Sequence, residues 1–246
     1  MANFSTQWYN ISMNIIDIDK VNTTFQYYAD DYQNAAPFPN ISLSGLFEHS
    51  MMKIIADEFI DCQSMSQSYK GEIEGGKFTE SDINKMGPVT QQFIRDCNSS
   101  EFLKALETLT GIDGLVADPK LYGGGLHQTE KNGRLKVHAD FNLMDGMVRK
   151  LNMLVYLNEG WQKEWGGYLE LWNKDMTEAV VQIPPVLGQV AIFTCSDISF
   201  HGLPDPISPP DGVYRRSIAL YYYKKEDILP EERSTLWKER PGEKFL

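Results

Sequence analysis

Cysteine is scarce in this chain. Its 246 residues include three cysteines, Cys62, Cys97 and Cys195. They are scattered and odd in number, so they indicate neither a disulfide framework nor a cysteine-rich metal site. The length allows one good hydrophobic core, and we expect a single domain over residues 1–246.

Basic residues are also in short supply. The chain has 23 Lys and Arg against 34 Asp and Glu, which gives a formal net charge of −11. Phosphate contacts need clustered cations, so nucleic acid is not expected as a main partner. The charge is compatible with a basic substrate, but a solvated acidic surface is the more common meaning.

Long apolar runs are missing. No stretch approaches the length of a membrane span, and the N-terminus lacks the pattern of a secretory signal. We therefore expect a cytoplasmic protein with no membrane partner. On this interpretation the Asn-x-Ser/Thr triplets are chance occurrences; they begin at Asn3, Asn10, Asn22, Asn40 and Asn98.

Histidine is rare, and two of the four histidines belong to a pattern that suggests metal binding. His138 and Asp140 lie two apart in a segment that reads as a strand, residues 135–141. Side chains two apart on a strand share a face, so these two can supply neighbouring ligands. Two His and one carboxylate form the facial triad of non-haem Fe(II) oxygenases. His-x-Asp alone is a weak signal, because the tripeptide is common.

His201 is the natural third ligand. It lies in a short apolar segment, residues 198–203, directly after the β-prone run at residues 188–193. His49 lies in an expected helix, where an isolated His is usually solvent-facing, so we leave it out of the site. His127 is expected to face away from the site, with a packing or supporting role.

A second site is indicated by the strand that begins at Arg215. Arg215 and Ser217 share one face of this strand, and Arg216 lies on the other. An inward-facing Arg needs a carboxylate or phosphate partner, because an unpaired buried charge is costly. A dicarboxylate cosubstrate would supply that partner, with a hydrogen bond from Ser217.

Taken together, these residues resemble the 2-oxoglutarate- and Fe(II)-dependent oxygenases, and more narrowly their prolyl-4-hydroxylase-like branch. Tyr156-Leu157-Asn158 and Gly166-Gly167-Tyr168-Leu169 strengthen the likeness, because that branch has such strands beside the cosubstrate pocket. The resemblance covers residues 121–225.

The resemblance implies several features of the site. Fe(II) would be held by His138, Asp140 and His201. The distal carboxylate of 2-oxoglutarate would pair with Arg215, helped by Ser217 and Tyr156, and Gln128 falls where relatives place a polar contact to the cosubstrate. Ascorbate as a reductant that rescues the iron is implied by the family only.

The expected reaction is hydroxylation with release of succinate and CO2. The substrate would be an amino acid, a peptidyl residue such as proline, or another small molecule, with O2 as co-reactant. Two alternatives remain open from the residues: a cupin-type metalloenzyme that does not use 2-oxoglutarate, and a non-catalytic jelly-roll binding module. Arg215 argues against the first and the complete triad against the second.

The fold expected is mainly β with supporting helices (α+β), a double-stranded β-helix or jelly roll with metal at its mouth. Residues 1–114 would be mainly helical support, residues 115–225 the catalytic core and residues 226–246 a tail anchored by Trp237. Strands are predicted at residues 37–43, 120–129, 135–141, 150–157, 167–172, 179–183, 189–193, 199–202 and 214–224.

The N-terminal part is expected to hold three helices. Ser44 would cap the first, with an apolar stripe of Leu46, Met51, Ile54, Ile55 and Phe59. The second would run from residue 80 or 81 to 97. The third would cover residues 101–110, capped by Ser100 and ended by Gly111. Residues 12–18 could form a strand, residues 63–78 read as a loop, and Gly123-Gly124-Gly125 suggests a bend or a close backbone approach.

Overall fold

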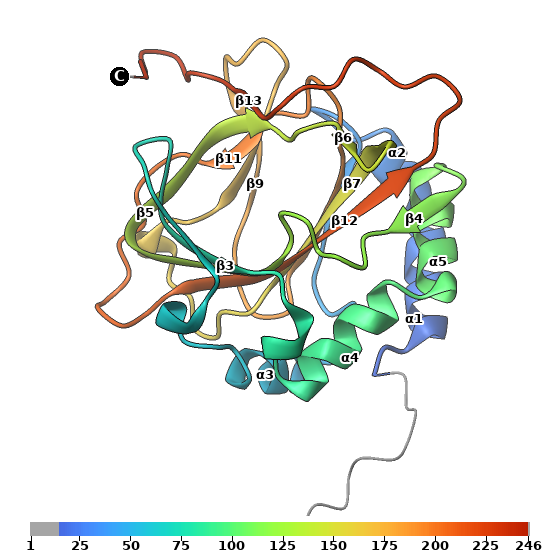
Figure 1. Cartoon of the computed structure of the whole chain (residues 1–246), viewed down its shortest axis with the longest axis horizontal. Coiled ribbons are helices and arrows are strands. Elements are labelled where there is room, and N and C mark those ends of the chain that lie inside the picture. The colour runs from blue at the N-terminus through green and yellow to red at the C-terminus, as the bar shows by residue number, and fades with distance from the viewer. Residues whose placement is uncertain (1–14, 246) are drawn as a thin grey trace, which may run out of the picture.

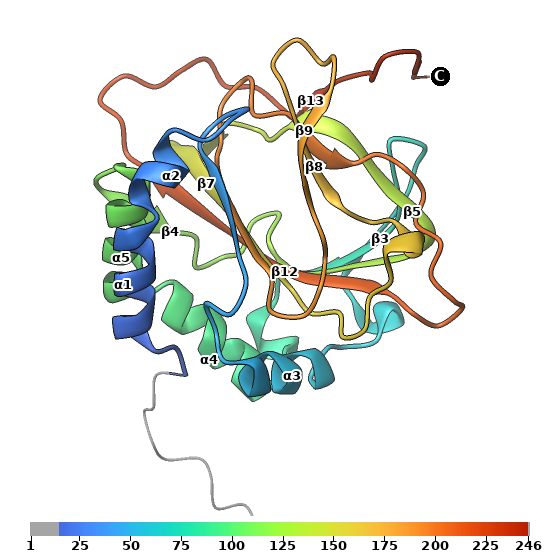
Figure 2. The same ribbon diagram turned by 180° about the vertical axis from the view of Figure 1, so that it is seen from behind.

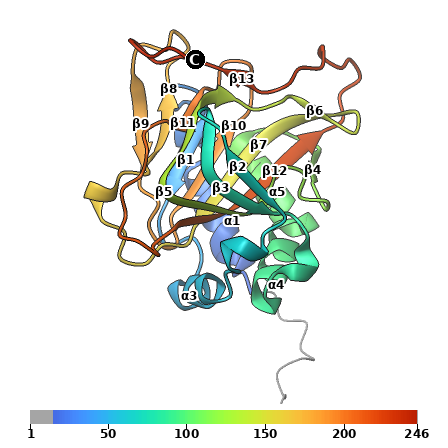
Figure 3. The same ribbon diagram turned by 60° about the vertical axis from the view of Figure 1, so that its left-hand side comes forward.

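The computed structural model describes residues 15–245, and its central feature is one large antiparallel sheet that curls into a nearly closed barrel (Figures 1 and 3). Eight strands form the main path, in the order β1-β10-β7-β12-β5-β11-β8-β9. The strands are β1 (Asn40–Leu43), β2 (Gln67–Lys70), β3 (Glu74–Glu80), β4 (Leu115–Ala117), β5 (Gly125–Ala139), β6 (Leu143–Met144), β7 (Met147–Tyr156), β8 (Leu169–Trp172), β9 (Ala179–Ile183), β10 (Val190–Thr194), β11 (His201–Leu203), β12 (Arg215–Lys224) and β13 (Leu236–Trp237).

The expected jelly-roll class is confirmed, and most predicted strands are present within a few residues of their expected bounds. The strand predicted at residues 179–183 coincides with β9. The main difference is β5, a single strand of 15 residues where two were predicted. Its early part pairs with β12 and its late part with β11, so β5 runs from one layer of the barrel into the other.

The gap between the two predicted strands, residues 130–134, is a bend in the continuous strand β5. Asn132 has a left-handed backbone (φ 66°), and a Cβ on Gly133 would lie 2.4 Å from the side chain of Thr129. Asn and Gly tolerate this geometry, which lets the strand bend sharply without ending. The gap between the two predicted strands therefore corresponds to curvature of one strand and not to a loop.

Helices cover the outside of one layer of the barrel (Figure 2). They are α1 (Ile18–Tyr27), α2 (Ala29–Gln33), α3 (His49–Asp57), α4 (Pro88–Cys97) and α5 (Ser100–Thr110), with short 3-10 turns at Cys62–Ser64, Ile83–Lys85 and Lys163–Trp165. The main core lies between the helices and one face of β7 and β12, and its buried residues include Met153, Ile218 and Phe102 of α5. Within residues 15–245, no helix combines the length and apolar composition needed to cross a lipid bilayer.

The ends of α5 follow from local chemistry. The Ser99 hydroxyl accepts a hydrogen bond from the backbone N–H of Phe102, and Gly111 takes a left-handed conformation (φ 70°). Serine is a preferred N-cap and glycine ends helices in this way. The prediction for this helix is confirmed, with the cap one residue earlier than Ser100.

The prediction for the first helix was wrong in its start. Helix α3 begins at His49, with Glu48 at the N-cap position, and Ser44 instead bonds the side chain of Gln189. The buried side of α3 consists of Met52 and Ile55, whereas Ile54 is exposed. A hydrogen bond to Gln189, which is distant in sequence and directly precedes β10, thus competes with the capping role that the local sequence suggested.

Two other N-terminal predictions need correction. Residues 12–14 lie outside the described residues, and the remainder of the strand considered at 12–18 runs into helix α1, which begins at Ile18. Helix α4 begins at Pro88, where proline is favourable in the first turn, and not near residue 80. Glu80 is the last residue of strand β3, with a fully buried side chain.

The segment predicted as a loop, residues 63–78, is largely a β-hairpin. Strands β2 and β3 pair with each other, and β3 also pairs with β5. The segment is polar and rich in glycine, which hides its strand character, because pairing with β5 supplies what local propensity lacks. Where β3 meets β5, a Cβ on Gly125 (φ 89°) would lie 2.2 Å from the carbonyl oxygen of Glu80, which confirms the close approach expected there.

Candidate active site

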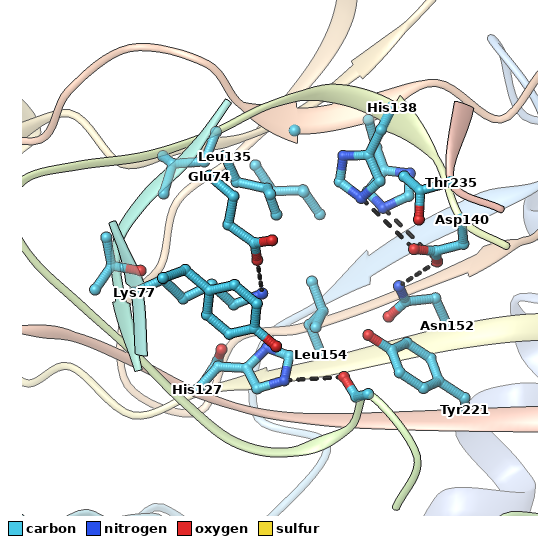
Figure 4. A pocket seen from close by; sticks show the side chains of 18 of the residues that line it. Glu74, Lys77, His127, Leu135, His138, Asp140, Asn152, Leu154, Tyr221 and Thr235 are labelled. Carbon is cyan, nitrogen blue, oxygen red and sulfur yellow. Dashed lines mark hydrogen bonds and ion pairs between the residues drawn. The ribbon is translucent and has the colours of Figure 1, made fainter. Parts of the chain in front are cut away.

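The three predicted metal ligands meet at one end of the barrel. His138 is the next-to-last residue of β5, Asp140 follows the end of that strand, and His201 is the first residue of β11. In the β5–β11 pairing, His201 lies directly opposite His138. One potential ligand atom from each of the three lies within 4.8 Å of the others (Figure 4).

Hydrogen bonds fix which imidazole nitrogen faces the centre. His138 Nδ1 lies 2.8 Å from the Lys136 carbonyl oxygen, and His201 Nδ1 lies 3.0 Å from that of Ser199. Each Nδ1 therefore carries the proton, and each Nε2 presents a lone pair. These Nε2 atoms lie 3.5 Å (His138) and 3.9 Å (His201) from the Asp140 carboxylate.

The electrostatics hold the cluster in its ligating form. Burial alone would raise the pKa of Asp140, but the Arg149 guanidinium and the two imidazoles hold that pKa well below its usual range. Burial, with the neighbouring His138, lowers the pKa of His201 to about 4. The site therefore offers a carboxylate and a neutral imidazole near neutral pH, as a divalent metal requires.

Arg149 and Asn152 hold the carboxylate from behind. Arg149 Nη1 lies 3.3 Å from Asp140 Oδ2, and Asn152 Nδ2 donates to the same oxygen at 3.2 Å. The guanidinium lies between the rings of Phe141 and Tyr221, 3.7 and 3.8 Å from their centroids. Asp140 Oδ1 is left facing His138 Nε2, while His201 Nε2 lies nearer Oδ2. Two imidazoles and one carboxylate arranged in this way fit a facial triad for Fe(II).

A cavity of about 200 Å³ opens beside the triad. The triad lies at one end, and β2, β3, β5, β7, β12 and the C-terminal tail contribute to its walls. The lining side chains labelled in Figure 4 are Glu74, Lys77, His127, Leu135, His138, Asp140, Asn152, Leu154, Tyr221 and Thr235.

Arg215 and Ser217 line the same cavity, as their strand face predicted, and both are almost fully buried. Arg215 Nε donates to the Gly167 carbonyl oxygen at 2.7 Å, and Nη2 donates to the Tyr156 hydroxyl at 3.3 Å. Among the described residues, no carboxylate lies within 4.0 Å of the Arg215 guanidinium. A buried cation that lines a cavity and has no acidic partner is suited to binding an anion.

Tyr156 and Gln128 occupy different positions from those expected. Tyr156 is fully buried and reaches the cavity only through Arg215. Gln128 is turned away from the cavity: its Oε1 accepts a hydrogen bond from Arg216 Nε at 2.8 Å. The alternation of side chains along β5 thus points Gln128 away from the cavity in this structure, and its contact with the cosubstrate stays a prediction.

His127 takes the inward position instead. It lies opposite Ser217 in the pairing of β5 with β12, lines the cavity, and its Nε2 is 3.1 Å from the Gly123 carbonyl oxygen. Burial, then the nearby Lys77, lowers the pKa of His127 well below its usual value. The signal that could have found it was register, because a partner of inward Ser217 must itself face inward.

Two further parts of the wall were missed from the sequence. The β2–β3 hairpin contributes Tyr69, Glu74 and Lys77. In the tail, β13 pairs with β5, so that the Trp237 ring lies 5.0 Å from the His138 ring, centroid to centroid. Trp237 does anchor the tail as expected, but the tail also forms part of the site.

Residues 124–223 match the family model described as the 2OG-Fe(II) oxygenase superfamily. This segment contains the triad, Arg215 and Ser217. No curated protein sequence gives a significant match to the chain.

Solved structures with a similar fold include two prolyl hydroxylases and one protein that was solved with 2-oxoglutarate. A prolyl-4-hydroxylase from Pseudomonas putida is 17% identical over 82% of this chain and 100% of its own, with a TM-score of 0.54. A Trichoplax adhaerens prolyl hydroxylase, solved with a hypoxia inducible factor peptide, is 15% identical over 83% of this chain and 91% of its own, with a TM-score of 0.60. HygX from Streptomyces hygroscopicus, solved with nickel, 2-oxoglutarate and hygromycin B, is 14% identical over 81% of this chain and 86% of its own, with a TM-score of 0.52.

The matched segment, residues 124–223, and the geometry of the triad together define the class of enzyme that this chain represents. It is a 2-oxoglutarate-dependent oxygenase whose Fe(II) site is His138, Asp140 and His201. The cupin-type and non-catalytic alternatives are thereby set aside.

Proposed function

We propose that this oxygenase hydroxylates an amino acid or a peptidyl residue, with proline as the first substrate to test, and releases succinate and CO2. The observation that carries the proposal is the position of Arg215. This buried residue lines the cavity that contains the triad, and it has no carboxylate partner among the described residues. This arrangement offers an anion site beside a metal site, as a dicarboxylate cosubstrate requires.

The residues have separate tasks in this proposal. His138, Asp140 and His201 would hold the metal by one face and leave the opposite face open towards the cavity. The Arg215 guanidinium and the Ser217 hydroxyl would bind the distal carboxylate, with Tyr156 fixing the guanidinium from behind. When bound, Fe(II) and 2-oxoglutarate supply the oxidation that adds one oxygen atom to the substrate.

The substrate class is supported by two kinds of relative. The Pseudomonas putida and Trichoplax adhaerens proteins are prolyl hydroxylases, and the second was solved with a peptide. HygX, of similar fold, was solved with hygromycin B, so the same fold also takes small molecules.

The whole chain, residues 1–246, is proposed to act as one oxygenase domain with helical support at 1–114, catalytic core at 115–225 and tail at 226–246. The use of ascorbate stays a prediction.

The test is succinate release from 2-oxoglutarate, followed by NMR with wild type and Asp140→Ala side by side. Wild type should form succinate slowly without substrate, only when Fe(II) and O2 are both present, and N-oxalylglycine should block this. A proline-containing peptide or free proline should speed succinate release and gain 16 mass units, the mass of one oxygen atom, by mass spectrometry.

Equal rates in wild type and Asp140→Ala would contradict the proposal. So would the absence of succinate over hours in wild type with iron bound. If succinate forms but no amino acid or peptide is oxidised, then the substrate class is wrong while the oxygenase assignment stands.

A further inference from the structure

An ion pair lies on the cavity wall formed by the β2–β3 hairpin. Lys77 Nζ and Glu74 Oε1 are 2.7 Å apart, and the two side chains are only 14% and 21% exposed. Both line the cavity that contains the triad, and they lie across it from Asp140 (Figure 4). Neither residue belongs to the metal site or to the anion site around Arg215.

An ion pair in this setting is expected to add little to stability. Removing two charges from water costs several kcal/mol, and apolar residues of similar size often stabilise a protein as well or better. Both side chains also line the cavity, where a ligand can reach them. A ligand with one positive and one negative charge could exchange with it and leave no charge unpaired.

The pair is separate from the anion site. Lys77 of β3 and Arg215 of β12 both lie opposite Thr129, on the two sides of β5. A full strand therefore lies between the backbones of the two cations, which places them roughly 9–10 Å apart at the backbone, or two strand spacings. Lys77 also has a carboxylate partner, whereas Arg215 has none among the described residues.

We propose that Glu74 and Lys77 recognise the ammonium and carboxylate groups of a free α-amino acid, which is the substrate of this site. The inference rests on the proposed function and narrows it. In a free amino acid the two charged groups are adjacent, so the ammonium can pair with Glu74 while the carboxylate pairs with Lys77. A residue inside a peptide has neither charge.

The size of the cavity agrees with this substrate class. It measures about 200 Å³, whereas sites for drug-sized ligands usually measure about 300–1,000 Å³. A cosubstrate of ten heavy atoms and a single amino acid are small enough to share it. The Tyr69 ring, 5.4 Å from Lys77 Nζ, adds a further contact that keeps the cation on this wall.

The experiment measures how far each compound stimulates succinate release above the substrate-free rate. The panel consists of free proline and the other protein amino acids, each compared with its N-acetyl derivative and its amide, and a prolyl peptide blocked at both ends. At least one free amino acid should stimulate, and its N-acetyl and amide forms should require roughly 10- to 100-fold higher concentration, the loss of one charge-assisted contact.

Two variants then assign the charges. Glu74→Gln should lose most of the discrimination against the N-acetyl form, and Lys77→Met most of the discrimination against the amide. A merely structural role would weaken all forms alike. Glu72→Gln is the matched control, because Glu72 is an exposed residue of the same hairpin that pairs with Arg134, and it should behave as wild type.

Several outcomes would overturn the inference. One is stimulation by the blocked peptide but by no free amino acid, and another is no stimulation by any free amino acid. A third is that Lys77→Met raises only the 2-oxoglutarate requirement, which would place Lys77 in the cosubstrate site. If the wild type with Fe(II) bound released no succinate in the absence of substrate, this would instead contradict the proposed function itself.

Discussion

Arg215 and Arg216 are adjacent in sequence but have different surroundings. Arg215 lines the cavity, whereas Arg216 lies over the Phe59 ring and bonds Gln128 on the outer side. Arg215→Met should therefore raise the 2-oxoglutarate concentration for half-maximal turnover roughly a hundredfold, the loss of a buried charge-assisted contact. Arg216→Met should change it little. The measurement is succinate release against 2-oxoglutarate concentration, and a larger effect of Arg216→Met would contradict the assigned roles.

Arg149 is a positioning residue for the metal site. Its guanidinium is buried, pairs with Asp140 and bonds the Tyr223 hydroxyl at 3.1 Å. Groups that orient a ligand typically change metal affinity by about 10- to 100-fold when they are removed. Arg149→Met should weaken Fe(II) binding in this range, and Arg149→Lys should weaken it less, because it keeps the charge.

Anaerobic Fe(II) titration measures this effect, and circular dichroism checks that the variants are folded. The nearby Asn152→Ala, which removes a neutral hydrogen bond to the same oxygen, provides a milder comparison. A folded Arg149→Met protein with unchanged Fe(II) affinity would show that Asp140 needs no such support.

At the scale of elements, the β2–β3 hairpin depends on one buried carboxylate at its base. Glu80 accepts hydrogen bonds from the Ser66 hydroxyl, the Asp82 backbone N–H and Lys85 Nζ. Burial alone would raise the pKa of Glu80, but these donors hold it below the usual value. A carboxyl with a lowered folded-state pKa stabilises the fold above its unfolded pKa, and this is lost as pH falls through the folded pKa.

Glu80→Gln should therefore lower the free energy of unfolding by about 1–3 kcal/mol at pH 7. The difference from wild type should shrink as the pH falls below the unfolded value near 4.5. Urea denaturation at pH 7 and at pH 4 measures both quantities, with the exposed Glu72→Gln as control. A difference that is the same at both pH values would mean that the charge of Glu80 is not what stabilises the hairpin.

At the scale of the whole molecule, a metal at the triad would join distant parts of the chain. The ligands come from β5 and β11, and β13 of the tail pairs with β5 at His138. A ligand that binds only the folded state stabilises it, by about 2.7 kcal/mol at a hundred times its Kd. For a chain of this size, this corresponds to a rise in Tm of roughly 5–10 °C.

Anaerobic Fe(II) should therefore raise the Tm of wild type and of His49→Ala, whose histidine is exposed on α3. It should have little effect on His201→Ala. Differential scanning calorimetry measures the shift. An equal rise in wild type and His201→Ala would contradict the ligand assignment.

What the sequence determined by itself was local. Period-two alternation put His138 with Asp140 and Arg215 with Ser217 on shared faces, and the scarcity of histidine left His201 as the third ligand. Runs of β-prone residues between turns predicted the jelly-roll strands, most of which the structure has. These features could be predicted because each depends on residues close together in the chain.

Strand register and the pairing of distant segments could be read only from the tertiary structure. The inward position of His127 and the outward position of Gln128 follow from the pairing of β5 with β12. The hairpin that carries Glu74 and Lys77 is a strand pair because β3 docks on β5, and its polar, glycine-rich sequence has little strand preference of its own. Hydrogen bonds between strands join residues far apart in sequence, so no local pattern encodes which partners meet.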